Sequence, residues 1–443
     1  MSYASAVASL YELGHELGRT PIHKFDLAHM RVLVTALGNP ERRFRSVLIA
    51  GTNGKGSTAA TLASILRAAG HRTGLYTSPH LMEVNERIRI DGKAISDADF
   101  AEVHDRVEEV AQRLVVDGEL PWHPSFFEML TGMAFDYFAR QNVEIAVLEV
   151  GMGGRLDATN VVEPCLSVIT DIALDHQKFL GNTTTEIARE KAGIIRPNGI
   201  VVTLPQHPEA NEVLGSVILE RNARAVNAAG YVPSVSPRAA EFASCDPYAV
   251  EFGGKEITID SPLTGRHQLR NVALAIAAAE QLNRCGCRIG ACDVERGIRQ
   301  TQWAGRFQVI PATADSPEFV LDVAHNPAGA WALRSTLSEH YPRRELIFVF
   351  GAMRDKAIVE IAEILFPLAE HVIATQAENP RSATAQEICA AAARTGTAVT
   401  PEPTVAAAVK RARAVVRANA VVVITGSIYI VGEAMRALGL LKS

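Results

Sequence analysis

Residues 46–57, SVLIAGTNGKGS, decide the fold class. SVLIA (46–50) is a short apolar run of strand type, and the turn Gly51-Thr52-Asn53-Gly54-Lys55-Gly56-Ser57 follows it directly. The next stretch, STAATLASILRAAG, has a helical pattern and ends at Gly70. In this order, backbone N–H groups, the positive end of a helix and the Lys55 side chain all point to one place. That arrangement predicts a loop that binds the phosphates of a nucleotide.

The loop departs from the strict pattern G-x4-G-K-[ST] at two places. Ile49 occupies the position of the first glycine, and Gly56 separates Lys55 from Ser57. The alternative is a strand–helix turn that is glycine-rich by chance. We favour nucleotide binding because strand, turn and helix all fall where the mechanism needs them.

Outward from this loop, short apolar runs of strand type alternate with helical stretches. The expected strands are RTGLYTS (72–78), EIAVLEV (144–150), LSVITDI (166–172) and GIVVTL (199–204), and helices are expected at 126–140 and 265–282. This alternation predicts a parallel sheet with helices on both faces, that is, an α/β domain. Residues 205–260 lack strong periodicity, and we expect peripheral strands and loops there.

A second alternating series follows WAGRF (303–307). Its expected strands are EFVLDV (318–323), ELIFVFG (345–351), HVIATQ (371–376) and VVVITGS (421–427). We therefore predict a smaller, Rossmann-like α/β C-terminal domain, with the division falling between 1–298 and 299–443. Two domains also suit a chain of 443 residues.

Composition restricts the kind of partner. The chain is 48% hydrophobic and 21% charged, and its formal net charge of -5 gives no electrostatic reason to expect nucleic acid or a membrane surface. No signal peptide or transmembrane segment is expected, so we predict a cytoplasmic protein. The cluster Cys285-Gly286-Cys287-x4-Cys292 has no second ligand pair at zinc-finger spacing, and we expect reduced thiols.

Oxygen- and nitrogen-bearing side chains follow three of the predicted strands. Ser78 follows RTGLYTS, Glu149 ends EIAVLEV just before Gly151-Met152-Gly153-Gly154, and His176 follows LSVITDI. Carboxyl ends of parallel strands meet at one sheet edge, where a nucleotide's Mg²⁺ would need such ligands. Alone, Glu149 would be a stray charge and His176 a structural residue; their shared edge favours a metal site.

Three other positions are ambiguous from the residues alone. Lys191 lies in the helical stretch TTTEIAREKAGII, where a solvated charge is the simpler explanation. Arg306 lies at the domain junction. Asp322-Val323-Ala324-His325-Asn326-Pro327 ends a strand, so Asp322 and His325 could contact a ligand or could form a turn that caps the next helix.

Twelve segments, in order along nearly the whole chain, resemble the folylpolyglutamate synthases and bifunctional dihydrofolate synthases, relatives of the Mur ligases. They are GTNGKGST (51–58), YTSPHL (76–81), NERIRI (85–90), SFFEMLTGMAF (125–135), LEVGMGGRLDATN (148–160), LDHQKFLG (174–181), IAREKAGI (187–194), GRHQLRNVALA (265–275), WAGRF (303–307), DVAHNP (322–327), FGAMRDK (350–356) and TGSIYIVGE (425–433). The set is highly specific, although no single member is.

The resemblance implies a monomeric ATP-dependent ligase that adds L-glutamate to folates and to dihydropteroate through an acyl phosphate. It implies ATP contacts at Asn53, Gly54, Lys55, Gly56, Ser57, Asn271, Arg306 and Asp322. It implies two magnesium ions held by Ser78, Glu149 and His176, and a carbamylated Lys191. Catalytic roles fall to Lys55, His176 and Lys191. It implies substrate contacts at Asp26, Leu27, Ala28, Ser125, Phe126, Phe127, Glu128, Leu156, Asp157, Ala158 and His325.

The sequence departs from the family pattern at three positions. Ala28 replaces a common glycine, which bears on dihydropteroate binding, Val323 replaces a glycine, and Ala304 replaces a proline. Two other functions are compatible with such a loop: a Mur-type ligase acting on a cell-wall precursor, and a nucleotide-binding switch without ligase activity. The SPHL and FFE segments favour folate over the first, and the grouping of Glu149, His176 and Lys191 argues against the second.

Overall fold

The computed structural model describes residues 1–14, 26–233, 246–314, 316–415 and 419–440. Two compact units divide the chain: the first comprises 1–238, 247–262 and 269–302, and the second comprises 239–246, 263–268 and 303–443. None of the described helices combines the length and apolarity needed to cross a bilayer.

The first unit is built on an eight-stranded sheet. In spatial order its strands are β4 (Lys93–Ala94), β3 (Ile88–Ile90), β2 (Thr73–Tyr76), β5 (Ile145–Glu149), β1 (Arg45–Ala50), β6 (Leu166–Ile169), β7 (Ile200–Thr203) and β8 (Arg224–Asn227). All neighbouring pairs from β2 to β8 are parallel, whereas β3 and β4 are antiparallel. The carboxyl ends of β2, β5, β1 and β6 therefore meet at one edge.

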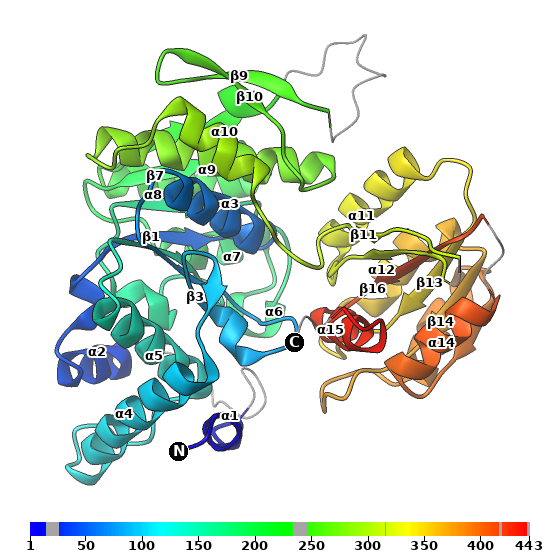
Figure 1. Ribbon diagram of the computed structural model, residues 1–443, viewed down its shortest axis with the longest axis horizontal. Helices are drawn as coiled ribbons and strands as arrows, with labels where there is room; N and C mark the ends of the chain where they lie inside the picture. The colour runs from blue at the N-terminus through cyan, green and yellow to red at the C-terminus, as the bar shows by residue number, and fades with distance from the viewer. Residues whose placement is uncertain (15–25, 234–245, 315, 416–418, 441–443) are drawn as a thin grey trace. The chain divides into compact units, whose positions relative to one another are not determined.

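Helices cover both faces of this sheet, as expected for a buried parallel sheet. They are α1 (Tyr3–Glu12), α2 (Leu27–Ala36), α3 (Lys55–Ala68), α4 (Asp97–Val116), α5 (Phe126–Arg140), α6 (Gln177–Leu180), α7 (Thr184–Ala192), α8 (Pro208–Glu220), α9 (Arg266–Arg284) and α10 (Ala291–Arg299). Figure 1 shows α3 and α10 on one side of β1 and α2, α4 and α5 on the other. The β9 (Tyr248–Phe252) and β10 (Lys255–Ile259) strands form a separate hairpin.

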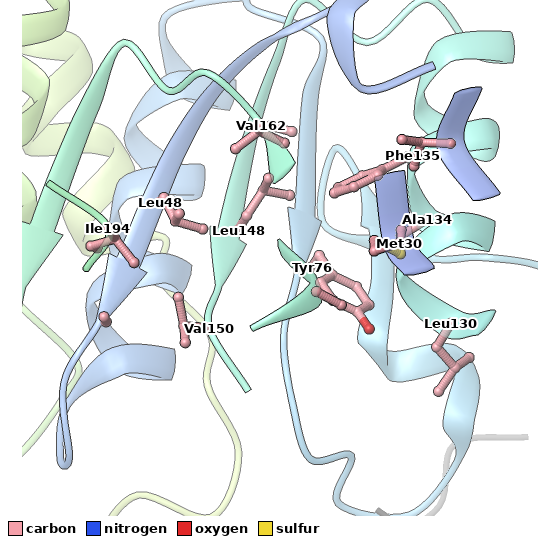
Figure 2. Close-up of a cluster of buried hydrophobic side chains, with 14 of the residues drawn as sticks. Met30, Leu48, Tyr76, Leu130, Ala134, Phe135, Leu148, Val150, Val162 and Ile194 are labelled. Atoms are coloured by element: carbon pink, nitrogen blue, oxygen red, sulfur yellow. The ribbon is translucent and has the colours of Figure 1, made fainter. Parts of the chain in front are cut away.

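The core of the first unit lies between the central strands and α5. Leu48 of β1 and Leu148 of β5 are fully buried, and they belong to one cluster with Tyr76 of β2. Leu130 and Phe135 of α5 face these strands from the helical side (Figure 2). Apolar residues on both faces of the strands explain why β1 and β5 are near-continuous hydrophobic runs in the sequence.

The prediction of peripheral strands and loops over 205–260 was wrong for one segment. Residues 208–220 form the helix α8, which packs against α7. Its buried residues Ala210, Val213 and Leu214 have helical spacing, and Pro208 at its start is compatible with a first turn. Gly215 and the β-branched residues weaken the helical signal, so packing against α7 decides the conformation. The β8 strand and the β9–β10 hairpin agree with the expectation.

The second unit contains a six-stranded sheet. Its strands, in spatial order, are β11 (Gln308–Ile310), β12 (Glu318–Leu321), β16 (Val421–Thr425), β13 (Leu346–Phe350), β14 (His371–Ala374) and β15 (Val399–Pro401). Only β11 is antiparallel to its neighbour. The helices are α11 (Pro327–His340), α12 (Ile358–Leu365), α13 (Ala385–Ala391), α14 (Val405–Val415) and α15 (Ile428–Ala437). The predicted α/β class is confirmed for both units.

Candidate active site at the edge of the parallel sheet

The predicted phosphate-binding loop leaves the carboxyl end of β1, the central strand of this edge. Its backbone is held by the segment after β6: the amides of Thr52 and Asn53 both donate to the Asp171 carbonyl, at 2.8 and 3.1 Å. The Thr52 hydroxyl donates to the Ala173 carbonyl at 2.9 Å. Helix α3 then begins at Lys55, with Gly56 and Ser57 in its first turn. The start of a helix thus faces the sheet edge, which is the arrangement that binds phosphate.

Two glycines of this loop are required by close approach. A Cβ at Gly51 would lie 1.8 Å from the Thr170 hydroxyl oxygen. Gly54 has φ +88°, and a Cβ there would lie 2.1 Å from Oδ1 of Asn271. Asn271 is buried in α9, more than two hundred residues along the chain. The fold therefore places this sequence-predicted ATP contact directly against the loop.

Two lysines meet at the carbonyl of Gly51. Lys191 donates to this oxygen at 2.6 Å, and Lys55 donates to it at 3.2 Å. Burial, followed by repulsion from Lys55, lowers the pKa of Lys191 to about 7, although Asp175 and Asp157 act in the opposite direction. The Lys191 side chain is 4% exposed. Lys191 is consequently a buried amine beside the loop and not the solvated helix charge that its sequence neighbourhood suggests.

Ser78 and Glu149 lie together at the same edge. Glu149 is buried at the end of β5, and the amide of Ser78 donates to its carboxylate at 3.3 Å. His176 follows β6 with φ +50° and precedes α6. In the part of the chain that the structure describes, no three His, Cys, Asp or Glu side chains form a ready metal cluster. A carboxylate, a hydroxyl and an imidazole suit Mg²⁺ only when phosphate oxygens and water complete its shell, which is its usual mode with nucleotides.

The three segments predicted to bind dihydropteroate are brought together. Helices α2 and α5 pack against each other and against the short helix that spans 158–161. Asp26 caps α2 by accepting from the amide of Ala28 at 2.9 Å, and Leu27 begins that helix. Ser125 and Glu128 form a reciprocal capping box at the start of α5. Polar residues of these segments thus hold the helix ends in place.

Aromatic and acidic residues connect α5 to the loop after β5. Phe127 lies so close to Gly151 that a Cβ there would meet its ring at 2.5 Å, whereas Phe126 is buried. Asp157 is buried and accepts from the amides of Met152 and Thr159 at 2.9 and 3.0 Å. Burial raises the pKa of this carboxyl group. Leu156 and Ala158, on either side of it, are therefore positioned by an internally bonded loop.

Arg306, Asp322 and His325 form a second group, inside the second unit. Both carboxylate oxygens of Asp322 are engaged, one by the amide of Phe307 and the other by that of Ala324, each at 2.9 Å. This turn holds Arg306 in place. His325 bonds through Nδ1 to the Val323 carbonyl at 2.9 Å, which assigns the proton of a neutral ring to Nδ1. Asp322 accordingly forms the turn that was the structural alternative for this segment.

Sequence reasoning missed an ion pair beside the loop. Arg270 donates to the Asp171 carboxylate through Nε at 3.1 Å and through Nη2 at 2.6 Å. Arg270 belongs to the segment GRHQLRNVALA, but it is 99 residues from Asp171. A buried arginine was missed as well: Arg87 donates to His80 at 2.9 Å and lies 5.3 Å from the centre of the Phe126 ring. Neither pair follows a spacing rule that a sequence could reveal.

Comparison with known proteins agrees with this geometry. Residues 127–279 match the model of the Mur ligase middle domain, and residues 305–428 match that of the Mur ligase glutamate ligase domain. The dihydrofolate synthase/folylpolyglutamate synthase of Bacillus subtilis is 33% identical over 93% of this chain and 94% of its own length.

Solved structures extend the similarity to the whole fold. Folylpolyglutamate synthase of Mycobacterium tuberculosis, solved with ADP and AMPPCP, is 33% identical and superposes with a TM-score of 0.86, covering 98% of this chain and 99% of that one. A bifunctional folylpolyglutamate synthase/dihydrofolate synthase with Mn, AMPPNP and L-glutamate bound is 28% identical, with a TM-score of 0.82 and coverage of 99% and 98%. The chain therefore belongs to the folylpolyglutamate synthase/dihydrofolate synthase family of Mur ligases, which are ATP-dependent glutamate ligases.

Proposed function

We propose that this protein joins L-glutamate to folates and to dihydropteroate at the expense of ATP, as a folylpolyglutamate synthase and dihydrofolate synthase. One observation carries the proposal: Lys55 and Lys191 meet at the Gly51 carbonyl, at the same sheet edge as Ser78 and Glu149. A loop with two lysines and a buried carboxylate suits phosphoryl transfer. The curated relative of Bacillus subtilis bears both activities in its name.

The reaction needs ATP because a carboxylate is a poor electrophile. The substrate carboxylate attacks the γ-phosphorus, the bond to the bridging oxygen breaks, and an acyl phosphate and ADP form. The amine of glutamate then attacks the acyl carbon; phosphate leaves with the bonding electrons, and the amine loses a proton. Both steps concentrate negative charge, which Lys55 and the N-terminus of α3 would stabilise.

ATP and magnesium are the proposed cofactors. Asn53, Gly54, Lys55, Gly56 and Ser57 would surround the phosphates, and Asn271 is adjacent to them. Arg306 and Asp322 are proposed as further ATP contacts. Ser78, Glu149 and His176 would hold two Mg²⁺ ions. Bound magnesium would neutralise charge on the transferred phosphoryl group. A solved relative with Mn and AMPPNP supports a divalent cation beside a nucleotide.

Carbamylation of Lys191 is part of the proposal. The neutral amine of Lys191 would attack carbon dioxide, form a carbamate and release a proton. The product is an anionic oxygen ligand in place of a cation, which would suit magnesium. Two features support this: the amine is buried, and its lowered pKa of about 7 leaves much of it unprotonated near neutral pH. With Lys55 and His176, Lys191 completes the proposed catalytic set.

The acceptor would bind where α2, α5 and the loop after β5 pack together. Its proposed contacts come from three short segments and one residue of the second unit: Asp26, Leu27, Ala28, Ser125, Phe126, Phe127, Glu128, Leu156, Asp157, Ala158 and His325. The aromatic rings of Phe126 and Phe127 suit a flat heterocycle such as a pterin.

We assign ATP and pterin binding to a domain of residues 1–298 and glutamate ligation to a domain of residues 299–443. Domain closure would exclude water, which would otherwise hydrolyse the acyl phosphate. A monomer in the cytoplasm is also proposed; light scattering of the purified protein and cell fractionation test these two statements.

Incubation with ATP, Mg²⁺ and L-glutamate tests the activity, with dihydropteroate or tetrahydrofolate as acceptor. We expect ADP release that requires both glutamate and acceptor, and a product mass increased by one glutamate residue. Glu149→Gln, which keeps the size of the side chain and removes its charge, is the control and should lose most of this turnover. ADP release that ignores glutamate would contradict the proposal.

A further inference from the structure

The ion pair of Asp171 and Arg270 connects three segments around the phosphate-binding loop. Asp171 follows β6, and its carboxylate accepts from Nε of Arg270 at 3.1 and 3.2 Å and from Nη2 at 2.6 Å. Nη2 also donates to the carbonyl of Pro205, just after β7, at 2.9 Å. An arginine held through two nitrogens has one preferred orientation, so this contact fixes geometry as well as adding attraction.

Asp171 is also the residue that supports the loop backbone. Its carbonyl oxygen accepts from both Thr52 and Asn53, which pair with it in a short antiparallel bridge. The side chain and the main chain of Asp171 therefore act on opposite partners: the carboxylate holds α9, and the carbonyl holds the loop.

Arg270 precedes Asn271, whose side chain lies against Gly54. The Asn271 carbonyl accepts from the hydroxyl of Thr58, in the first turns of α3, at 3.4 Å. Because α9 comes from a distant part of the chain, no local geometry fixes its rotation or its depth relative to the loop. The Arg270 contact with Asp171 supplies that constraint one residue before Asn271.

We propose that Asp171 and Arg270 are positioning residues that set the register of Asn271 against the phosphate-binding loop and thereby determine affinity for the nucleotide. The pair itself touches neither the reacting atoms nor the proposed metal ligands. This inference rests on the proposed function only in that the loop binds a nucleotide. It predicts an effect on nucleotide affinity with little effect on the chemical step.

The test uses the full-length protein with three variants. Asp171→Asn removes the charge but keeps the main-chain carbonyl that supports the loop. Arg270→Lys keeps the charge but removes the two-nitrogen contact. The double variant Asp171→Arg with Arg270→Asp restores an ion pair in reverse. Arg284→Gln is the matched control, because it breaks a pair with Glu280 on the same helix, away from the loop.

Binding of a fluorescent ADP analogue with Mg²⁺ gives Kd, and steady-state assays give KM for ATP, KM for glutamate and kcat. We expect each single variant to raise Kd and KM for ATP by about five- to tenfold, the range for a partly exposed charged contact with good geometry. We expect kcat and KM for glutamate to stay within about twofold, and the double variant to recover part of the affinity. The control should match the wild type.

Circular dichroism and thermal unfolding of each variant identify damage to the fold. Folded single variants whose Kd and KM for ATP are unchanged would overturn the inference, as would a loss of kcat at constant Kd. A wild-type protein that binds no nucleotide would instead overturn the proposed function, so the two failures are distinguishable. A purely structural role would lower the melting temperature and leave Kd unchanged.

Discussion

The ionisation of Lys191 gives the most direct test of the site. Its amine is buried, bonds to the Gly51 carbonyl at 2.6 Å, and has a pKa lowered from 10.5 to about 7, first by burial and then by Lys55. Only an unprotonated amine reacts with carbon dioxide. We therefore predict that Lys191 forms a carbamate near neutral pH, whereas surface lysines of the same protein do so to a much smaller extent.

The expected selectivity follows from the two pKa values. At pH 8, a group with a pKa of about 7 is roughly 90% unprotonated, whereas a lysine at 10.5 is roughly 0.3% unprotonated. The reactive fraction thus differs by about 300-fold. Carbamate on Lys191 should increase with pH through a midpoint near 7, the pKa of the buried amine.

Carbon-13 NMR of the protein equilibrated with ¹³C-labelled bicarbonate measures this carbamate directly. We expect one signal of about one equivalent per chain that is absent in Lys191→Met. Lys178→Met, which removes an exposed lysine, is the control and should keep the signal. A midpoint near 10, or a signal that persists in Lys191→Met, would refute the reasoning from burial.

Three further predictions concern stability and the loop. In CO₂-free buffer, Lys191→Met should raise the free energy of unfolding. The folded-state pKa lies below the unfolded one, so the penalty of the charged amine is complete below pH 7 and disappears as pH rises toward 10.5. The gain should reach as much as about 5 kcal/mol at low pH, by 1.36 kcal/mol per unit of pKa shift, and denaturant titrations at several pH values measure it; a gain that grows with pH would contradict it. Gly54→Ala combines φ +88° with a contact at 2.1 Å, so nucleotide affinity by calorimetry should fall by about tenfold or more. Gly118→Ala, at φ +75° in open space, is its control and should bind normally. Leu148→Ala should cost about 3 kcal/mol of unfolding free energy in urea, because it leaves a cavity beside Leu48 and Phe135. Val116→Ala, 84% exposed, should cost less than about 0.5 kcal/mol; equal losses would show that burial is not the cause.

Local pattern was sufficient for most of the secondary structure. The predicted helix at 126–140 matches α5, and the runs around 46–50, 144–150 and 199–204 form β1, β5 and β7. Apolar runs bounded by glycine and polar residues carry that information within the run itself. Helix α8 was missed because Gly215 and several β-branched residues oppose a helix, and only packing against α7 outweighs them.

Residues at strand ends could be placed because topology makes them converge. Once β2, β5, β1 and β6 are parallel neighbours, Ser78, Glu149 and the loop at 51–57 must lie at one edge. Lys191 is different, since sequence alone favoured a solvated charge. Its buried position beside Gly51 depends on how α7 packs under the loop.

The sequence by itself determined the α/β class, the phosphate-binding loop and the family, because each depends on residues that are adjacent or in fixed order. Only the tertiary structure decided the state of Lys191, the approach of Asn271 to Gly54, and the contact of Asp171 with Arg270. The physical reason is that desolvation and close packing depend on what surrounds a side chain in space. Those surroundings come from segments a hundred or more residues away.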